Sequence, residues 1–277
     1  MSVRERVADP RFWPIRSTIL ERFGDADEAP PPVGSWGARL DGLTLPVSFA
    51  PQPPRNRRQK YASRTYYQRI VLERVVPSRE GNWHDFFNML VWTTFPRAKL
   101  AIHSRELELL EEHLDAPGRT NAEDTLSLLD EGGAVALVDG EEAKEALERE
   151  DGAAISRCAE RRACRVAIIG HAIYEHLWLR QMNVFAMLAP LRGSVPERSE
   201  LVSKAFDELL AEAIGGRTFS LESKRYGRLS LDGLLGAQAS CLRGLLGAQA
   251  SCLRLSFADE LGREGQARLL STTVSDS

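Results

Sequence analysis

The sequence predicts a mixed α+β fold in which helices pack around a small sheet. Residues 82–97 place their apolar side chains at the spacing of a helix, with two Trp, three Phe and one Met among them. After residue 120 the pattern changes to short apolar runs separated by glycines, which is typical of strands. We therefore expect a sheet that contains a β-hairpin and one further strand.

The first helix is expected to begin at Asn82, because an Asn side chain can accept a hydrogen bond from the first turn. Pro96 ends this helix or begins the next, which continues to about residue 114. Thr125–Leu129 and Ala134–Val138 are predicted to pair as a hairpin, with Gly132 and Gly133 supplying the positive φ of its turn. The remaining predictions are helices at 141–149, 171–179 and 200–214 and a strand at 165–169.

Three regions follow from composition. Residues 1–60 are expected to form an N-terminal helix and a Pro-rich extended segment packed on the core. Residues 61–220 are expected to form a single α+β domain, and residues 221–277 a tail. The tail repeats GLLGAQASCLR without a substitution at 233–254, and we interpret this pair as an inserted passenger segment rather than a paired interaction helix.

The composition is that of a soluble globular protein, with 43% hydrophobic and 27% charged residues in 277. A formal net charge of −3 favours neither nucleic acid nor an anionic membrane. The N-terminus lacks the apolar core of a signal peptide, and no run approaches the ~20 apolar residues that span a bilayer. We expect a cytoplasmic protein, and its four cysteines, which form no C-x-x-C pair, are expected to be reduced.

The predicted helix at 82 carries the first candidate site. His84 and Asn88 are four residues apart and share one face, and Asp85 lies about 100° round the helix from His84. A histidine near a carboxylate can act as a general base or bind a metal. The alternative, which we favour for any single residue, is that His84 and Asp85 bind buried backbone groups or an arginine.

A second candidate follows the predicted strand that ends at Gly170. His171 would open the next helix, and Glu175 lies on the same face one turn later. Binding sites often form at the carboxyl ends of strands, and helix N-termini favour anions. A capping or core role for His171 is an equally good interpretation.

Polar residues elsewhere could bind a substrate, and arginine suits a phosphate or carboxylate because its planar fork makes two bonds. An internal ion pair, for example of Arg97 with Asp85 or Asp124, would use the same groups. No set of metal ligands is assigned, although a divalent metal remains open as a cofactor. The predicted substrate-binding residues are Asn82, Asn88, Arg97, Arg119 and Asp124.

The basic stretch at 55–74, with interleaved tyrosines, raises binding of nucleic acid through phosphate contacts and stacking. The acidic net charge and the lack of a motif that reads RNA or DNA count against it. A solvated loop that leads into the domain explains this stretch equally well.

Four segments together resemble a bacterial family known as domain of unknown function 3025. They are YYQRIVLERVVPSREGNWHDFF at 66–87, its continuation to Lys99, GRTNAEDTLSLLDEGGAVALV at 118–138 and RVAIIGHAIYEHL at 165–177. The resemblance spans about 66–214 and implies a fold unit without an activity. His103 and Ser127 depart from the family pattern, and 180–200 lacks its Gly-Leu-Thr stretch. The residues that match are His84, Asp85, Arg97, Asp124, Asp130, Glu131, His171 and Glu175.

Three functions are open. The first is hydrolysis of a small or phosphate-bearing substrate in one polar pocket, where His84 is base or ligand, Asp85 orients it, and Arg97 binds an anionic group. His171 and Glu175 would close that pocket. The second is a non-catalytic binding or adaptor domain whose buried polar network specifies the fold, and the third is nucleic-acid binding through 55–74.

Overall fold

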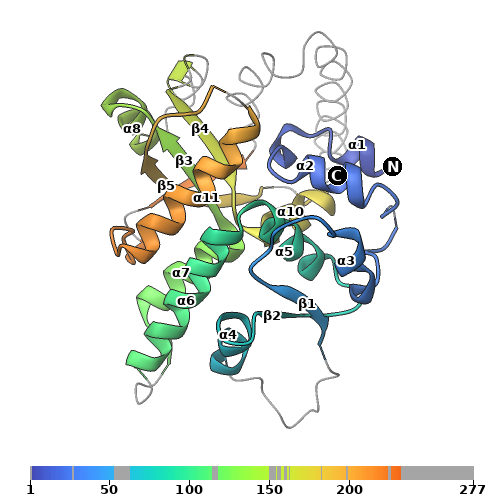
Figure 1. The fold of residues 1–277 in the computed structure, drawn as a ribbon. Helices are drawn as coiled ribbons and strands as arrows, with labels where there is room; N and C mark the ends of the chain where they lie inside the picture. Colours follow the sequence, from blue (N-terminus) through green and yellow to red (C-terminus); the bar gives the residue numbers. More distant parts are fainter. Residues whose placement is uncertain are drawn as a thin grey trace, which may run out of the picture.

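The computed structural model describes residues 2–26, 28–52, 63–113, 118–149, 154, 157–158, 161, 163–181, 183–197, 199–223 and 226–231. It confirms the mixed α+β class (Figure 1). The four-stranded sheet with α8 and α11 lies at one end of the molecule, and a two-stranded sheet with α3 and α4 lies at the other. Helices α5 and α10 lie between these two ends.

The larger sheet has the strand order β4-β3-β5-β6. Its strands are β3 (Gly133–Val138), β4 (Cys164–Ile168), β5 (Phe185–Arg192) and β6 (Gly227–Ser230). The central strands β3 and β5 are parallel, whereas β4 and β6 pair with them in antiparallel fashion at the two edges. The smaller sheet pairs β1 (Ser48–Pro51) and β2 (Val75–Ser78) in parallel. Every residue of β3 and β4 is buried, so the core surrounds this half of the sheet.

The helices enclose this core from several sides. Helix α6 contacts α4, α7 and α11, and α10 packs on both α5 and α7. These helices are α1 (Val3–Arg6), α2 (Arg16–Arg22), α3 (Val33–Arg39), α4 (Ser63–Val71), α5 (Trp83–Thr94), α6 (Pro96–Glu112), α7 (Asn121–Gly132), α8 (Glu141–Glu148), α10 (His171–Trp178) and α11 (Ser199–Gly215), with a 3-10 turn at Pro10–Phe12.

The start of α5 is as predicted. The side chain of Asn82 accepts a hydrogen bond from the backbone N of Asp85 at 3.0 Å and so caps the helix. Pro96 occupies the first turn of α6, where its missing N–H costs nothing because that donor would have no partner inside the helix. Helix α6 ends at Glu112, two residues before the predicted end.

The predicted hairpin is wrong, because residues 121–132 form a helix that leads directly into β3. A capping box fixes its start: Thr120 Oγ1 accepts from the backbone N of Glu123, and the Glu123 carboxylate accepts from the backbone N of Thr120. Leu126 and Leu129 are then buried on one helical face. The Thr-x-x-Glu spacing therefore outweighs the strand-like composition of this segment.

Three other parts of the fold differ from the prediction. The Pro-rich segment that was expected to be extended contains α3 and β1 within its described residues. Strand β5 forms where no strand was predicted, and β6 lies within the residues assigned to the tail. The tandem repeat at 233–254 lies outside the described residues.

The N-terminal residues belong to the core around α5 and α10. The ring centroid of Phe12 lies 5.6 Å from that of Tyr174 and 6.3 Å from that of Phe87. Arg6 donates to the backbone O of Trp178 at 2.7 Å and lies over its ring. In the part of the chain that the structure describes, no helix is long and apolar enough to cross a membrane.

Candidate functional site

The candidate site lies where the first turns of α5 and α10 meet. The Nδ1 atom of His84, on α5, is 3.0 Å from Oε2 of Glu175, on α10. The Nε2 atom of His84 is 2.9 Å from Nε2 of His171, the first residue of α10. His171 and Glu175, one helical turn apart, therefore contact the two nitrogens of a single imidazole ring.

His171 is held from the opposite side by α7. Its Nδ1 is 2.7 Å from the backbone O of Asp130, and since a carbonyl only accepts, Nδ1 carries the proton. Burial, and after it the nearby Lys99 ammonium, lower the pKa of His171 well below its usual value. The ring is therefore neutral, and its Nε2 presents a lone pair to His84.

Gly170 permits the contact between His171 and the backbone O of Asp130. A Cβ atom at Gly170 would lie 2.5 Å from both the backbone O of Glu131 and the backbone N of Gly133, which is closer than atoms can approach. The backbone N atoms of Ile169 and Gly170 both donate to the carbonyl of Gly133, at 3.0 and 2.8 Å. Strand β4 therefore ends in close contact with the α7–β3 junction, and His171 begins beside Asp130.

The three side chains differ in their access to solvent. The side chains of His84 and Glu175 are 26% and 24% exposed, whereas that of His171 is 5% exposed. Solvent thus reaches the site from the side of His84 and Glu175, whereas His171 lies in the interior.

A buried network of charged groups continues inward from His171. Lys99, which is fully buried, forms an ion pair with the carboxylate of Asp130. Burial alone would raise the pKa of Asp130, but the Lys99 ammonium holds it below its ordinary value. Asp130 thus joins the two clusters, with its carbonyl on His171 and its carboxylate on Lys99.

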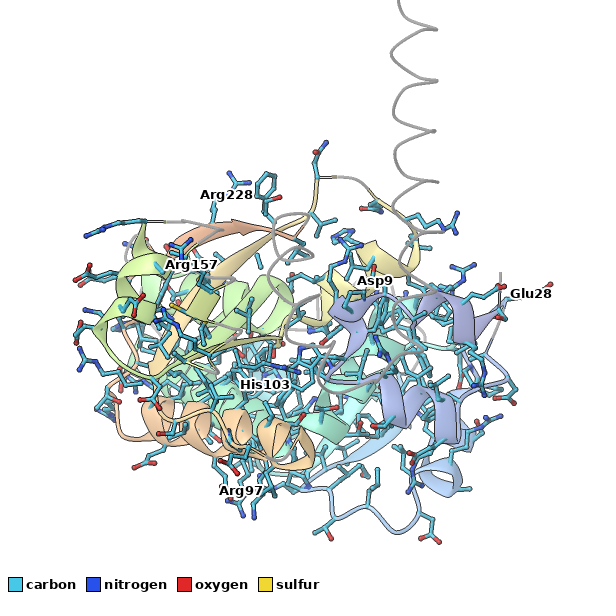
Figure 2. All side chains as sticks on the ribbon, turned by 90° about the horizontal axis from the view of Figure 1, so that it is seen from above. Asp9, Glu28, Arg97, His103, Arg157 and Arg228 are labelled. Atoms are coloured by element: carbon cyan, nitrogen blue, oxygen red, sulfur yellow. The ribbon has the colours of Figure 1, made fainter. Side chains whose placement is uncertain are left out.

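The inner end of this network is a buried histidine. His103 Nδ1 lies 3.0 Å from Glu106 Oε2, and Tyr67 and Ser127 donate to the other oxygen of Glu106 at 3.0 and 3.1 Å. His103 Nε2, 4.0 Å from Asp130 Oδ2, has no hydrogen-bond partner in the described ranges. Figure 2 shows His103 deep among the elements, whereas Arg97 projects at the rim beside α11.

Comparison with known proteins identifies the family. A model of the family described as "Protein of unknown function (DUF3025)" matches residues 49–240. The chain belongs to the DUF3025 family. Neither a curated protein nor a solved structure matches it. The matched region is wider than the 66–214 of the sequence resemblance, and it includes β1 except for Ser48, all of β6 and the whole candidate site.

In this DUF3025 domain, Asp85 does not orient His84 as expected. Its Oδ2 accepts from the backbone N of Arg79 at 2.6 Å, and its Oδ1 accepts from the guanidinium of Arg79 at 2.8 Å. Asp85 therefore fixes the turn between β2 and α5, and Glu175 is the carboxylate on His84. The alternative that Asp85 pairs with an arginine is thus correct, although the partner is Arg79 rather than Arg97.

The predicted arginines pair with carboxylates on the surface. Arg97 binds Glu208 at 2.9 Å with its side chain 66% exposed. Arg119 binds Asp124 at 3.0 Å, and also donates to the backbone O of Glu123. None of these contacts joins them to His84.

The two predicted asparagines serve the fold. Asn82 is the helix cap described above. Asn88 is buried, and its Oδ1 has no hydrogen-bond partner within the described residues. Both side chains belong to the same helix as His84, but neither shares a contact with its ring.

The inner network was not assigned from the sequence. The predicted hairpin, with strands at Thr125–Leu129 and Ala134–Val138, places Asp130 in the turn between them. Lys99, His103 and Glu106 follow one another at intervals of four and three residues, so they share one face of α6. A polar stripe on an otherwise amphipathic helix was the signal that could have revealed the network.

No group of three or more His, Cys, Asp or Glu side chains in the described ranges is arranged to hold a metal ion. The Nε2 atoms of His84 and His171 lie 2.9 Å apart, so both can contact one point. Any further ligand at that point would have to come from solvent or from a bound molecule.

Proposed function

We propose that this DUF3025 protein hydrolyses a small or phosphate-bearing substrate at His84, His171 and Glu175. The observation that carries the proposal is the position of His84: both ring nitrogens are bound, yet the side chain is 26% exposed. The partial exposure of His84 leaves its ring within reach of a molecule from solvent, at the end of a network that is otherwise buried.

The chemistry follows from the two contacts of the ring. Glu175 accepts from Nδ1–H and so directs Nε2 toward the point it shares with His171. As water attacks the substrate, its oxygen bonds to the phosphorus or carbonyl carbon and its proton passes to Nε2. The carboxylate of Glu175 stabilises the imidazolium that forms. The bond between the phosphorus or carbonyl carbon and the leaving-group oxygen then breaks, and that oxygen takes the proton from Nε2. In an alternative role, His84 would be a ligand of a bound metal ion, and that ion would position the attacking water.

Arg79 supports a phosphate-bearing substrate. Its side chain is 47% exposed, and its guanidinium interacts electrostatically with Glu175 as well as with Asp85. Arg79 is thus a cation beside the site, in the place expected for Arg97. Arginine is well suited to bind the oxygens of a phosphate.

Three chromogenic substrates test the proposal: p-nitrophenyl phosphate, bis(p-nitrophenyl) phosphate and p-nitrophenyl acetate. We expect turnover of at least one, with or without added zinc, manganese or magnesium. His84→Ala, His171→Ala and Glu175→Ala should each lower it by roughly 10²-fold or more. His113→Ala, at an exposed position that follows α6, is the matched control and should leave the rate unchanged. Absence of turnover under all these conditions, or equal rates in the His84 variant, would overturn it.

A second candidate function is that of a non-catalytic binding or adaptor domain. The observation that favours it is the internal network of Lys99, Asp130, His103 and Glu106, which is buried and can specify the fold by itself. This function predicts that His84→Ala lowers the free energy of unfolding as much as Lys99→Ala does. Hydrolysis predicts instead that His84→Ala folds with near-normal stability and loses turnover.

Binding of nucleic acid stays a prediction that gains little support. Residues 53–62 lie outside the described residues. Of the nearby tyrosines, Tyr67 donates to Glu106, and the rings of Tyr66 and Tyr67 lie 6.2 and 5.8 Å from that of His103. Rings packed inward in this way are not offered for stacking on bases.

A further inference from the structure

The protons of His84 and His171 can be assigned from their partners. His171 Nδ1 faces the carbonyl of Asp130 at 2.7 Å, and His84 Nδ1 faces the carboxylate of Glu175 at 3.0 Å. A carbonyl and an ionised carboxylate only accept, so each Nδ1 carries a hydrogen. In its neutral form each imidazole has one N–H, and with that hydrogen on Nδ1 its Nε2 carries a lone pair.

The two Nε2 atoms then meet as acceptors only 2.9 Å apart. Two acceptors at this distance repel unless a positive charge lies between them. That charge is either one extra proton shared by the rings or a cation bound by both nitrogens. The negative charge of Glu175, beside the two rings, would stabilise either the shared proton or the bound cation.

We propose that His84 and His171 bind a divalent transition-metal ion of the zinc class through their Nε2 atoms. Metal-binding histidines almost always donate their other N–H to a carboxylate or a backbone carbonyl, which fixes the ring and strengthens the ligand. Here both arrangements occur: Glu175 holds His84, and the carbonyl of Asp130 holds His171. Imidazole nitrogens select zinc, copper, nickel or iron over magnesium and calcium, which prefer oxygen.

The distances require a small adjustment. Zinc–nitrogen bonds of about 2.0–2.1 Å at a tetrahedral angle place the two nitrogens about 3.3 Å apart. The rings, at 2.9 Å, would therefore separate by about 0.4 Å. His84, with its side chain 26% exposed, can make this movement, whereas His171 is fixed in the interior.

The surrounding charges suit a cation. Lys99 lies near His171, but its charge is balanced by the ion pair with Asp130, which leaves the carboxylate of Glu175 beside the site. With two protein ligands among the described residues, the remaining positions on the ion are open to water or substrate. Open positions are typical of catalytic rather than structural zinc sites.

This inference rests on the proposed hydrolysis and assigns His84 the role of ligand rather than base. The two proposals can fail separately, because binding of the metal is measured without turnover. Zinc binding through the histidines without hydrolysis would overturn the proposed function alone. Hydrolysis that depends on His84 in protein that binds no zinc would overturn the metal site alone.

The test is equilibrium dialysis and calorimetry on the full-length, metal-stripped protein with zinc, nickel and magnesium. We expect one zinc or nickel ion that is lost, or bound at least 10²-fold more weakly, in His84→Ala and His171→Ala. Glu175→Gln should weaken it by about 10–100-fold, whereas His113→Ala should bind as the wild type does. Comparison with these variants distinguishes zinc bound at the two histidines from zinc bound by the four cysteines. Magnesium should not bind.

His84→Gln is a second variant that keeps the proposal testable if His171→Ala fails to fold, because the His84 side chain is partly exposed. Circular dichroism establishes that each variant is folded. No zinc or nickel bound, or equal affinity in folded His84 variants and wild type, would overturn the site. The site would also be overturned if nitrogen-15 NMR showed that a proton remains between the two rings at saturating zinc.

Discussion

The Nε2 atoms of His84 and His171 lie 2.9 Å apart, although 87 positions separate these residues in the chain. The contact depends on α5 and α10 packing together and on Gly170, which lets α10 begin against the α7–β3 junction. Glu175 and the carbonyl of Asp130 hold the two outer nitrogens. This chain of contacts links the partly exposed His84 on α5 to the buried Lys99–Asp130 pair.

Gly170→Ala should separate His171 from Asp130. The added Cβ would meet backbone atoms at 2.5 Å, so α10 must move, and we expect a loss of about 1–3 kcal/mol or more of unfolding free energy. Gly37→Ala is the control: its Cβ meets nothing within 4 Å, and alanine should stabilise α3 by up to about 1 kcal/mol. Chemical denaturation measures both. Equal stability of the two variants would contradict the close approach at Gly170.

Lys99→Met should be strongly destabilising, by about 3–5 kcal/mol, because it leaves the charge of Asp130 buried without its partner. Adding Asp130→Asn removes that charge and should recover part of the loss. Arg97→Ala, which breaks the exposed pair with Glu208, should cost less than about 1 kcal/mol. Urea unfolding compares the three, and a Lys99 variant as stable as the Arg97 variant would disprove a buried ion pair.

Glu175→Gln and Asp85→Asn distinguish a carboxylate that serves the site from one that stabilises the fold. Asp85→Asn weakens the bonds to Arg79 and should lower the unfolding free energy by about 1–3 kcal/mol. Glu175→Gln, at a partly exposed position, should change it by less than about 1 kcal/mol but lower turnover and zinc affinity. Thermal unfolding and the hydrolysis assay measure the pair. The opposite order of effects would mean that Asp85 serves the site.

Asp207 should make stability depend on pH. Burial raises the pKa of this carboxyl group to about 6, although it accepts from the backbone N of Ala98 at the start of α6. The folded protein thus binds this proton more tightly than the unfolded chain, whose carboxyl titrates near 3.9. Above pH ~6 the buried charge of Asp207 lowers the unfolding free energy by its full amount, and the unfolding free energy rises again as the pH falls toward ~4.

Asp207→Asn keeps an oxygen for Ala98 but has no proton to bind. Between pH 7 and pH 4, the unfolding free energy of the wild type should rise relative to this variant by up to about 3 kcal/mol. Urea unfolding at both pH values gives the difference. A difference that does not change with pH would show that Asp207 titrates normally.

The parts of the fold that could be predicted are those with local signals. Asn82 and Pro96 mark the starts of α5 and α6, and the glycine before His171 marks the end of β4. Spacing along α10 placed His171 and Glu175 on one face, and both contact His84. That these two helices meet depends on long-range packing, which the spacing within each helix does not contain.

The parts that could not be predicted depend on competing or distant effects. Strand β5 contains Pro190, which argues against a central strand. The structure accommodates it because β6 pairs only with Phe185–Leu188, so the strand is unpaired on that side at Pro190 within the described residues. Asp130 looked like part of a glycine-rich turn, and only the α7 helix turns its carboxylate toward Lys99.

The protonation of the His171 ring tests the account most directly. Nitrogen-15 NMR of metal-free protein with labelled histidines, assigned with His84→Gln and His171→Asn variants, should show a proton on Nδ1 of His171 and an unprotonated Nε2. Zinc should then shift Nε2 of both His84 and His171. A proton on Nε2 of His171, with a free Nδ1, would contradict the contact with Asp130 and with it the site.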